Sequence, residues 1–159
     1  HLLNNLVFGS FFGVLLALDI GVGWAGLMMI LTGSLGNGLN AWIQPPEHAS
    51  IGASTAVFGA VGMLMGLQWR RPLATRSRLR RWAPPIVGAV FLGLLGTAGE
   101  RTDVMAHLTG VVVGLAVGWA TAGVADRWRL ALRGQGLPTV AAVLILASAW
   151  WLALPGQWR

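Results

Sequence analysis

The sequence consists mainly of long apolar runs separated by short polar links. Runs of about 18 or more residues with few charges are candidates for crossing a membrane. Backbone groups in lipid must be paired within their own segment, and these runs are too long and uniformly apolar for barrel strands. The sequence therefore predicts an all-α, polytopic membrane bundle of six transmembrane helices. The six spans cover residues 2–18, 22–43, 51–69, 82–98, 103–124 and 137–154.

Composition supports a membrane protein, because only 10% of the 159 residues are charged, whereas a soluble domain carries about 25%. The chain has no cysteine and three histidines, which excludes thiolate metal sites and disulfides. We expect no metal and no cofactor. The chain starts within an apolar run, at His1 rather than Met, and we expect it to be a single transmembrane domain, residues 1–159, whose natural N-terminus lies upstream.

All eleven basic residues are arginines, and they predict the orientation of the spans. Nine of them lie in two links, residues 70–81 and 126–136, which fall on one side of the membrane if six spans alternate. Only Arg101 and Arg159 lie on the other side. The arginine-rich side is expected in the cytoplasm, so the first, third and fifth spans run from outside to inside. The use of arginine alone, with abundant Ala and Gly, is compatible with a GC-rich bacterial genome. We therefore expect a bacterial inner membrane, with the site toward its outer side.

The net charge of +6 does not indicate a nucleic-acid partner. The chain shows no fold or base-reading motif to accompany the charge. The link at residues 70–81 could bind anionic headgroups, although setting the topology is a sufficient role for it. We expect the lipid bilayer, rather than nucleic acid, to be the partner of the basic residues. The sequence does not indicate an oligomeric state.

Polar residues inside spans are costly and are candidates for function. They occur near the start of three spans: His1 and Asn5, then Ser54, then His107. Because these three spans run in the same direction, the polar groups lie at similar depth. If the spans are neighbours, the groups converge on one site near the outer surface.

The residue types at this site suit acyl transfer. A serine hydroxyl is a weak nucleophile until a base takes its proton, which an imidazole can do. His1 and Asn5 are one helical turn apart, and their N–H groups could stabilise an oxyanion. Taken singly, Ser54 and His107 have ordinary alternatives, a helix-packing hydrogen bond and a structural histidine.

Two further polar residues are given structural interpretations. Asp103 lies one turn before His107 and could be taken for a third member of a triad. We expect it instead to favour the positive N-terminal end of its helix. His48 lies in a polar link and is interpreted as a surface residue.

Glycine pairs four residues apart, such as Gly62/Gly66 and Gly110/Gly114, predict close helix packing.

At these residues the sequence resembles the rhomboid family of intramembrane proteases. The first five residues, His-Leu-Leu-Asn-Asn, match the family's His-x-x-x-Asn at the start of its second helix. Gly52-Ala-Ser54 resembles the Gly-x-Ser of helix four. Ala106-His107-x-x-Gly110-x-x-x-Gly114 resembles the motif of helix six. The six spans would be helices two to seven, so the family's first helix and the loop that follows it are absent.

The resemblance implies a serine endopeptidase that cleaves transmembrane segments of other proteins near the outer leaflet. Ser54 would be the nucleophile and His107 the base, while His1, Asn5 and the Ser54 amide would form the oxyanion hole. Phe58 would stack on the catalytic imidazole. The chain departs from the family at Thr55, where glycine is usual, which puts the substrate preference in doubt.

Two other interpretations remain open. One is a non-catalytic rhomboid-like protein that binds transmembrane helices; such relatives usually lack the serine or the histidine, and this chain has both. The other is a fragment of a small transporter or channel, which predicts polar residues through the whole depth of the bundle. Here they concentrate at one end.

Overall fold

The computed structural model describes residues 2–45, 47–48, 53–71, 82–83, 86–90, 93, 103–130 and 132–154. Over these residues the secondary structure is helical, with no strand, which confirms the predicted all-α class. The elements in order are α1 (Leu2–Ile20), α2 (Val22–Ile43), α3 (Ser54–Arg70), α5 (Val104–Leu130), the 3₁₀ turn η2 (Leu132–Gln135) and α6 (Gly136–Ala153).

Among the described residues, four segments are long and apolar enough to cross a membrane: Leu2–Ile20, Val22–Ile43, Val104–Ala125 and Gly136–Ala153. They match the first, second, fifth and sixth predicted spans to within about two residues. The third predicted span corresponds to α3, whose 17 residues are at the short end of the range of about 17–25 for a spanning helix. Most of the fourth span, 82–98, lies outside the described residues.

Two helix boundaries differ from the sequence prediction. The third span was expected from residue 51, but α3 begins at Ser54, after a turn at Ala53. The fifth was expected to end at residue 124, but α5 continues to Leu130. No glycine or proline interrupts residues 124–130, so the backbone hydrogen bonds continue past the apolar part. The end of an apolar run predicts where a helix leaves the lipid, but the helix itself can continue beyond that point.

Contacts along their lengths show that α1, α3 and α5 run in the same direction. In the first half of α1, a Cβ on Gly9 would lie 3.4 Å from Val57 of α3. Near its end, Asp19 pairs with Arg71, directly after α3. Helix α2 runs the opposite way, with Gly36 near Thr55 and Gly33 near Ala56. Helix α5 runs with α3, because Gly110 lies against Thr55 and Gly118 against Met63. The predicted common direction of the first, third and fifth spans is therefore confirmed.

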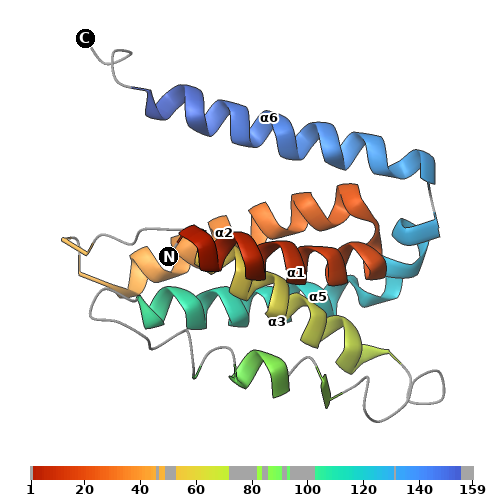
Figure 1. Ribbon diagram of the computed structural model, residues 1–159, viewed down its shortest axis with the longest axis horizontal. Helices are drawn as coiled ribbons and strands as arrows, with labels where there is room; N and C mark the ends of the chain where they lie inside the picture. The colour runs from red at the N-terminus through yellow and green to blue at the C-terminus, as the bar shows by residue number, and fades with distance from the viewer. Residues whose placement is uncertain are drawn as a thin grey trace.

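Glycines bring α3 and α5 into backbone contact. A Cβ on Gly62 would overlap the carbonyl oxygen of Val111, and one on Gly114 would overlap that of Gly59. Small residues at four-residue spacing allow this close approach between membrane helices. The prediction of close packing from the glycine pairs is confirmed for α3 and α5, which lie against each other below α1 and α2 in Figure 1.

Helix α6 lies at the edge of the bundle beside α2 (Figure 1). Gln135, immediately before α6, accepts a hydrogen bond from the amide of Gly23 through its Oε1 at 2.9 Å. Most α6 side chains are exposed, as expected for a helix that faces lipid. Helix α3 is the opposite case, because twelve of its residues are buried.

Candidate active site

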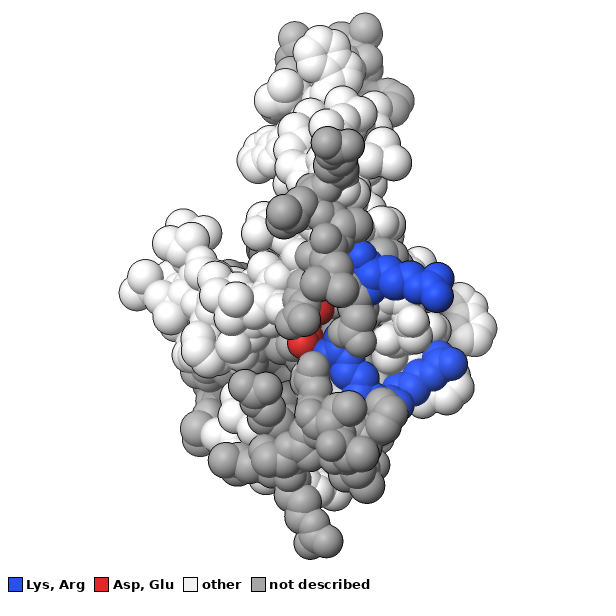
Figure 2. Space-filling model, turned by 90° about the vertical axis from the view of Figure 1, so that its right-hand side faces the viewer, with Lys and Arg blue, Asp and Glu red and all other residues white. Residues whose placement is uncertain are grey.

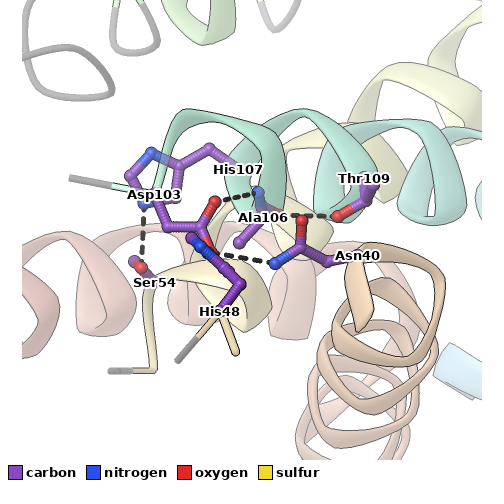
Figure 3. Close-up of polar contacts among 7 residues, drawn as sticks. All are labelled: Asn40, His48, Ser54, Asp103, Ala106, His107 and Thr109. Atoms are coloured by element: carbon purple, nitrogen blue, oxygen red, sulfur yellow. Dashed lines mark hydrogen bonds and ion pairs between the residues drawn. The ribbon is translucent and has the colours of Figure 1, made fainter. Parts of the chain in front are cut away.

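Ser54 and His107 lie together at one end of the α3–α5 pair (Figure 3). The Ser54 Oγ is 2.9 Å from the His107 Nε2, which is hydrogen-bond distance. His107 is buried, with 6% of its surface exposed. Because α3 and α5 are parallel and held close by glycines, residues in the first turn of each helix are brought into contact. The structure thus brings together the two residues that the sequence singled out as nucleophile and base.

The position of Ser54 at the start of its helix has a chemical consequence. Ser54 is the first residue of α3, and the amides of a helix's first turn have no acceptor within the helix. These N–H groups point out of the helix and form the positive end of its dipole. The Ser54 amide is therefore available to bind an oxyanion beside its own hydroxyl.

Phe58 stacks on the His107 ring, as the resemblance implies. The ring centroids are 4.3 Å apart and the planes differ by 28°. Phe58 is one turn after Ser54 on α3 and is only 2% exposed. One turn of α3 therefore contacts the imidazole twice, through the serine hydroxyl at its edge and through the phenyl ring on its face.

Asn5, expected in the oxyanion hole, is half-buried on α1. It shares a helix face with Gly9, which lies against Val57 of α3. Since α1 and α3 are parallel, Asn5 is at the level of Ser54, on the side of α1 that faces α3. The second expected donor, His1, lies outside the described residues, and the oxyanion role of both stays a prediction.

Thr55, the departure from the family's glycine, is buried with its methyl group between two other helices. A Cβ on Gly36 of α2 would lie 2.9 Å from the Thr55 Cγ2, and a Cβ on Gly110 of α5 would lie 3.2 Å from it. The threonine methyl thus occupies space that the two glycines leave open. It fills the junction of α2, α3 and α5.

A second polar cluster adjoins the dyad and was not expected as a unit (Figure 3). The Asp103 Oδ2 accepts a hydrogen bond from Asn40 at 2.8 Å and pairs with the His48 Nε2 at 2.8 Å. The Asp103 Oδ1 accepts from the Ala106 amide at 2.9 Å, so the predicted stabilisation of the helix N-terminus takes the form of an N-cap.

His48 is exposed, as interpreted, but it has a specific partner in Asp103. Asn40 was missed altogether. It is only 2% exposed near the end of an apolar span, and a polar residue in that position is a signal that could have found it.

Comparison with known proteins assigns the chain to a family. The family model described as a rhomboid domain matches residues 1–124. The chain belongs to the rhomboid family. A relative named "Rhomboid-like protein 11, chloroplastic" from Arabidopsis thaliana is 32% identical over 131 residues, covering 75% of this chain and 46% of the relative. The chain thus spans about half the length of that curated relative. No solved structure gave a significant match.

The matched region of this rhomboid includes α1, α2, α3 and most of α5, and therefore every residue of the site. Helix α6 lies beyond it. Together with the apolar helices, family membership indicates a multi-pass membrane protein.

Proposed function

We propose that this rhomboid is an intramembrane serine endopeptidase that cleaves transmembrane segments of other proteins. The observation that carries the proposal is the 2.9 Å contact between the Ser54 Oγ and the His107 Nε2. A nucleophile within hydrogen-bond distance of its base is the arrangement that acyl transfer requires. The rhomboid family includes serine proteases, and this chain has both residues of the dyad.

In the proposed reaction the Ser54 Oγ attacks the scissile carbonyl carbon while the His107 Nε2 takes the hydroxyl proton. The carbonyl oxygen becomes an oxyanion, which the Ser54 amide, Asn5 and His1 stabilise. When the tetrahedral intermediate collapses, the C–N bond breaks and His107 gives its proton to the leaving amine. Water then attacks the ester on Ser54, with His107 again as base, and releases the second product.

Phe58 has a role in this scheme that its geometry supports. Stacked on the imidazole at 4.3 Å, it restricts rotation of the ring about its side-chain bonds. The ring must keep its Nε2 toward Ser54 during both proton transfers. No aspartate is assigned to orient the ring.

The substrate is proposed to be a membrane helix that unwinds locally near the outer leaflet. The site lies at the end of α3 and α5 opposite Arg70 and Arg71, and arginine-rich ends are expected in the cytoplasm. The proposed location is a bacterial inner membrane with the site toward its outer side. The name of the curated relative includes the word "chloroplastic". The orientation argument depends only on the distribution of arginines and is independent of which membrane holds the protein.

The direct test is cleavage of a model transmembrane substrate in detergent. Ser54→Ala and His107→Ala should each abolish cleavage, whereas Ser148→Ala should retain it. Ser148 is a matched control because it is an exposed serine on α6 whose hydroxyl bonds its own helix at Leu144. Full cleavage by either dyad variant would reject the assignment.

The non-catalytic alternative makes a different prediction with a fluorophosphonate probe. A protease should be labelled at Ser54, and the label should be lost in Ser54→Ala and strongly reduced in His107→Ala. A protein that only binds transmembrane helices should give no labelling while still retaining a substrate helix in a pull-down.

A further inference from the structure

Within the part of the chain that the structure describes, Asp103 is bonded to three segments around the proposed dyad. Its Oδ2 binds Asn40, in the last turn of α2, and His48, in the link before α3. Its Oδ1 binds the amide of Ala106, in the first turn of α5. Hydrogen bonds to a carboxylate are about twice as strong as bonds between neutral groups. A single side chain therefore ties the segments before Ser54 and around His107 to one point.

The contact with α5 matters because His107 lies in the first turn of that helix. Helix ends fray, since their first amides have no partner within the helix. The Asp103 carboxylate binds the amide directly before His107, and the Asp103 carbonyl accepts from the His107 amide at 3.2 Å. Both contacts fix the backbone that carries the imidazole.

The contact with His48 acts on the other member of the dyad. His48 lies six residues before Ser54 in the link that joins α2 to α3. Its ring nitrogen is 2.8 Å from the same carboxylate oxygen that Asn40 binds. The Asp103–His48 pair thus holds His48, in the link before α3, beside the start of α5, at the end of the helices where the serine hydroxyl meets the imidazole.

We infer that Asp103, with His48 and Asn40, is a positioning residue that holds Ser54 and His107 at reacting distance. The inference rests on the proposed protease function. Asp103 does not take part in proton transfer in this account. Its oxygens are turned toward Asn40, His48 and Ala106, while the His107 ring is turned toward Ser54 (Figure 3). The effect of losing it should appear in kcat rather than in substrate affinity.

The experiment compares four variants of the full chain in detergent. Asp103→Ala removes all three contacts. Asp103→Asn removes the charge but keeps a side chain that can cap a helix. His48→Ala removes only the contact with the link, and His48→Gln replaces it with another N–H donor. Glu47→Gln is the matched control, because it removes an exposed carboxylate from the same link.

Three quantities are measured for each variant: kcat and KM for a transmembrane substrate, the rate of fluorophosphonate labelling at Ser54, and the thermal unfolding temperature. A misplacement of about 1 Å at an active site can lower a rate by about 100-fold. We expect kcat and labelling to fall together, by about 100-fold in Asp103→Ala and about 10-fold in Asp103→Asn and His48→Ala. His48→Gln should recover most of the loss, KM should change little, and Glu47→Gln should match the wild type.

A purely structural role for the cluster would give a different pattern. Rate losses would then follow the folded fraction, and His48→Gln would not restore kcat in protein that is already folded. His48→Ala keeps the helix cap, so it remains informative even if Asp103→Ala fails to fold. An active wild type with unchanged kcat and labelling in Asp103→Asn and His48→Ala would overturn the inference alone. A wild type that neither cleaves nor is labelled would reject the proposed function and the inference with it.

Discussion

Two aspartates at opposite ends of the bundle each bind neighbouring segments, but they do so with different partners. Asp103, at the end with the dyad, binds an amide side chain, a histidine and a backbone amide. Asp19, at the other end, binds Arg71 at 2.8 Å and Gln68 at 3.1 Å. Figure 2 faces this second end, where basic side chains lie to one side of a small acidic surface.

The difference in partners indicates that the dyad end serves the reaction and the arginine end serves stability. The Asp19 pair is largely buried, with side-chain exposures of 14% and 7%, and it ties α1 to the end of α3 through an arginine that is always charged. The Asp103 cluster lies where two first turns meet and where a serine hydroxyl is 2.9 Å from an imidazole. Damage at the dyad end should therefore reduce turnover, and damage at the arginine end should reduce stability.

The largest effect is expected midway between the two ends, at Gly114 of α5. A Cβ there would overlap the carbonyl oxygen of Gly59 and lie 2.9 Å from the amide nitrogen of Met63, both backbone atoms of α3. Gly114→Val should push the helices apart, lower the unfolding temperature and reduce cleavage by about 100-fold or more. Thermal unfolding and substrate cleavage in detergent measure the two losses.

Gly123→Val is the matched control for this substitution. Gly123 is on the same helix, and nothing lies within 4 Å of a Cβ placed there. This variant should retain both stability and cleavage. Equal losses in the two valine variants would mean that helix propensity, rather than the α3–α5 approach, controls the site.

The second effect concerns the arginine end alone. Asp19→Asn or Arg71→Gln should lower the free energy of unfolding by about 3 kcal/mol, because each breaks a largely buried ion pair. At a temperature where the protein remains folded, the labelling rate of Ser54 should stay near that of the wild type. The double variant Asp19→Asn/Arg71→Gln should be less destabilised than the sum of the single variants.

A labelling rate that falls as far as stability in these variants would contradict the separation of the two ends. It would show that breaking the ion pair at the arginine end also changes the geometry of the dyad, through α3. The comparison then has to be made at matched folded fractions, which thermal unfolding curves supply.

The third effect returns to the dyad end. Phe58→Leu keeps an apolar side chain but removes the ring that stacks on His107. Aromatic pairs of this kind are worth about 0.5–1.5 kcal/mol, so kcat should fall by roughly 2- to 10-fold. Phe58→Tyr should stay close to the wild type. Phe11→Leu is a control because Phe11 is 52% exposed on α1, and cleavage assays of all three variants measure the effect.

Much of the fold could be predicted from the sequence because lipid imposes simple rules on a chain. The bounds of α2 follow directly from its apolar run, and the shared direction of α1, α3 and α5 follows from alternation of the spans. The convergence of Ser54 and His107 was predicted from depth and direction. Only the structure could show that α3 and α5 are direct neighbours with overlapping glycine contacts.

The Asp103 cluster could not be assembled from the sequence for a physical reason. Asn40, His48 and Asp103 come from a helix end, a link and a helix cap, and no periodicity relates them. The capping role of Asp103 was predicted because an N-cap is a local interaction. The methyl group of Thr55 illustrates the same limit, since its environment is set by glycines on two other helices.

The smallest effect is expected at Arg70, which binds α5 from the exposed surface of the arginine end. Its guanidinium carbon lies 4.6 Å from the Trp119 ring centroid, and its Nη1 donates to the Trp119 carbonyl at 2.9 Å. Exposed cation–π contacts are worth about 0.5–1 kcal/mol, so Arg70→Gln should lower stability by about that amount and leave cleavage unchanged. Arg127→Gln removes another exposed charge and serves as the control in thermal unfolding. A loss of stability in Arg70→Gln larger than that in Asp19→Asn would reverse this order. The contacts of Arg70 with α5, rather than the buried ion pair, would then be the main stabilising contacts at this end.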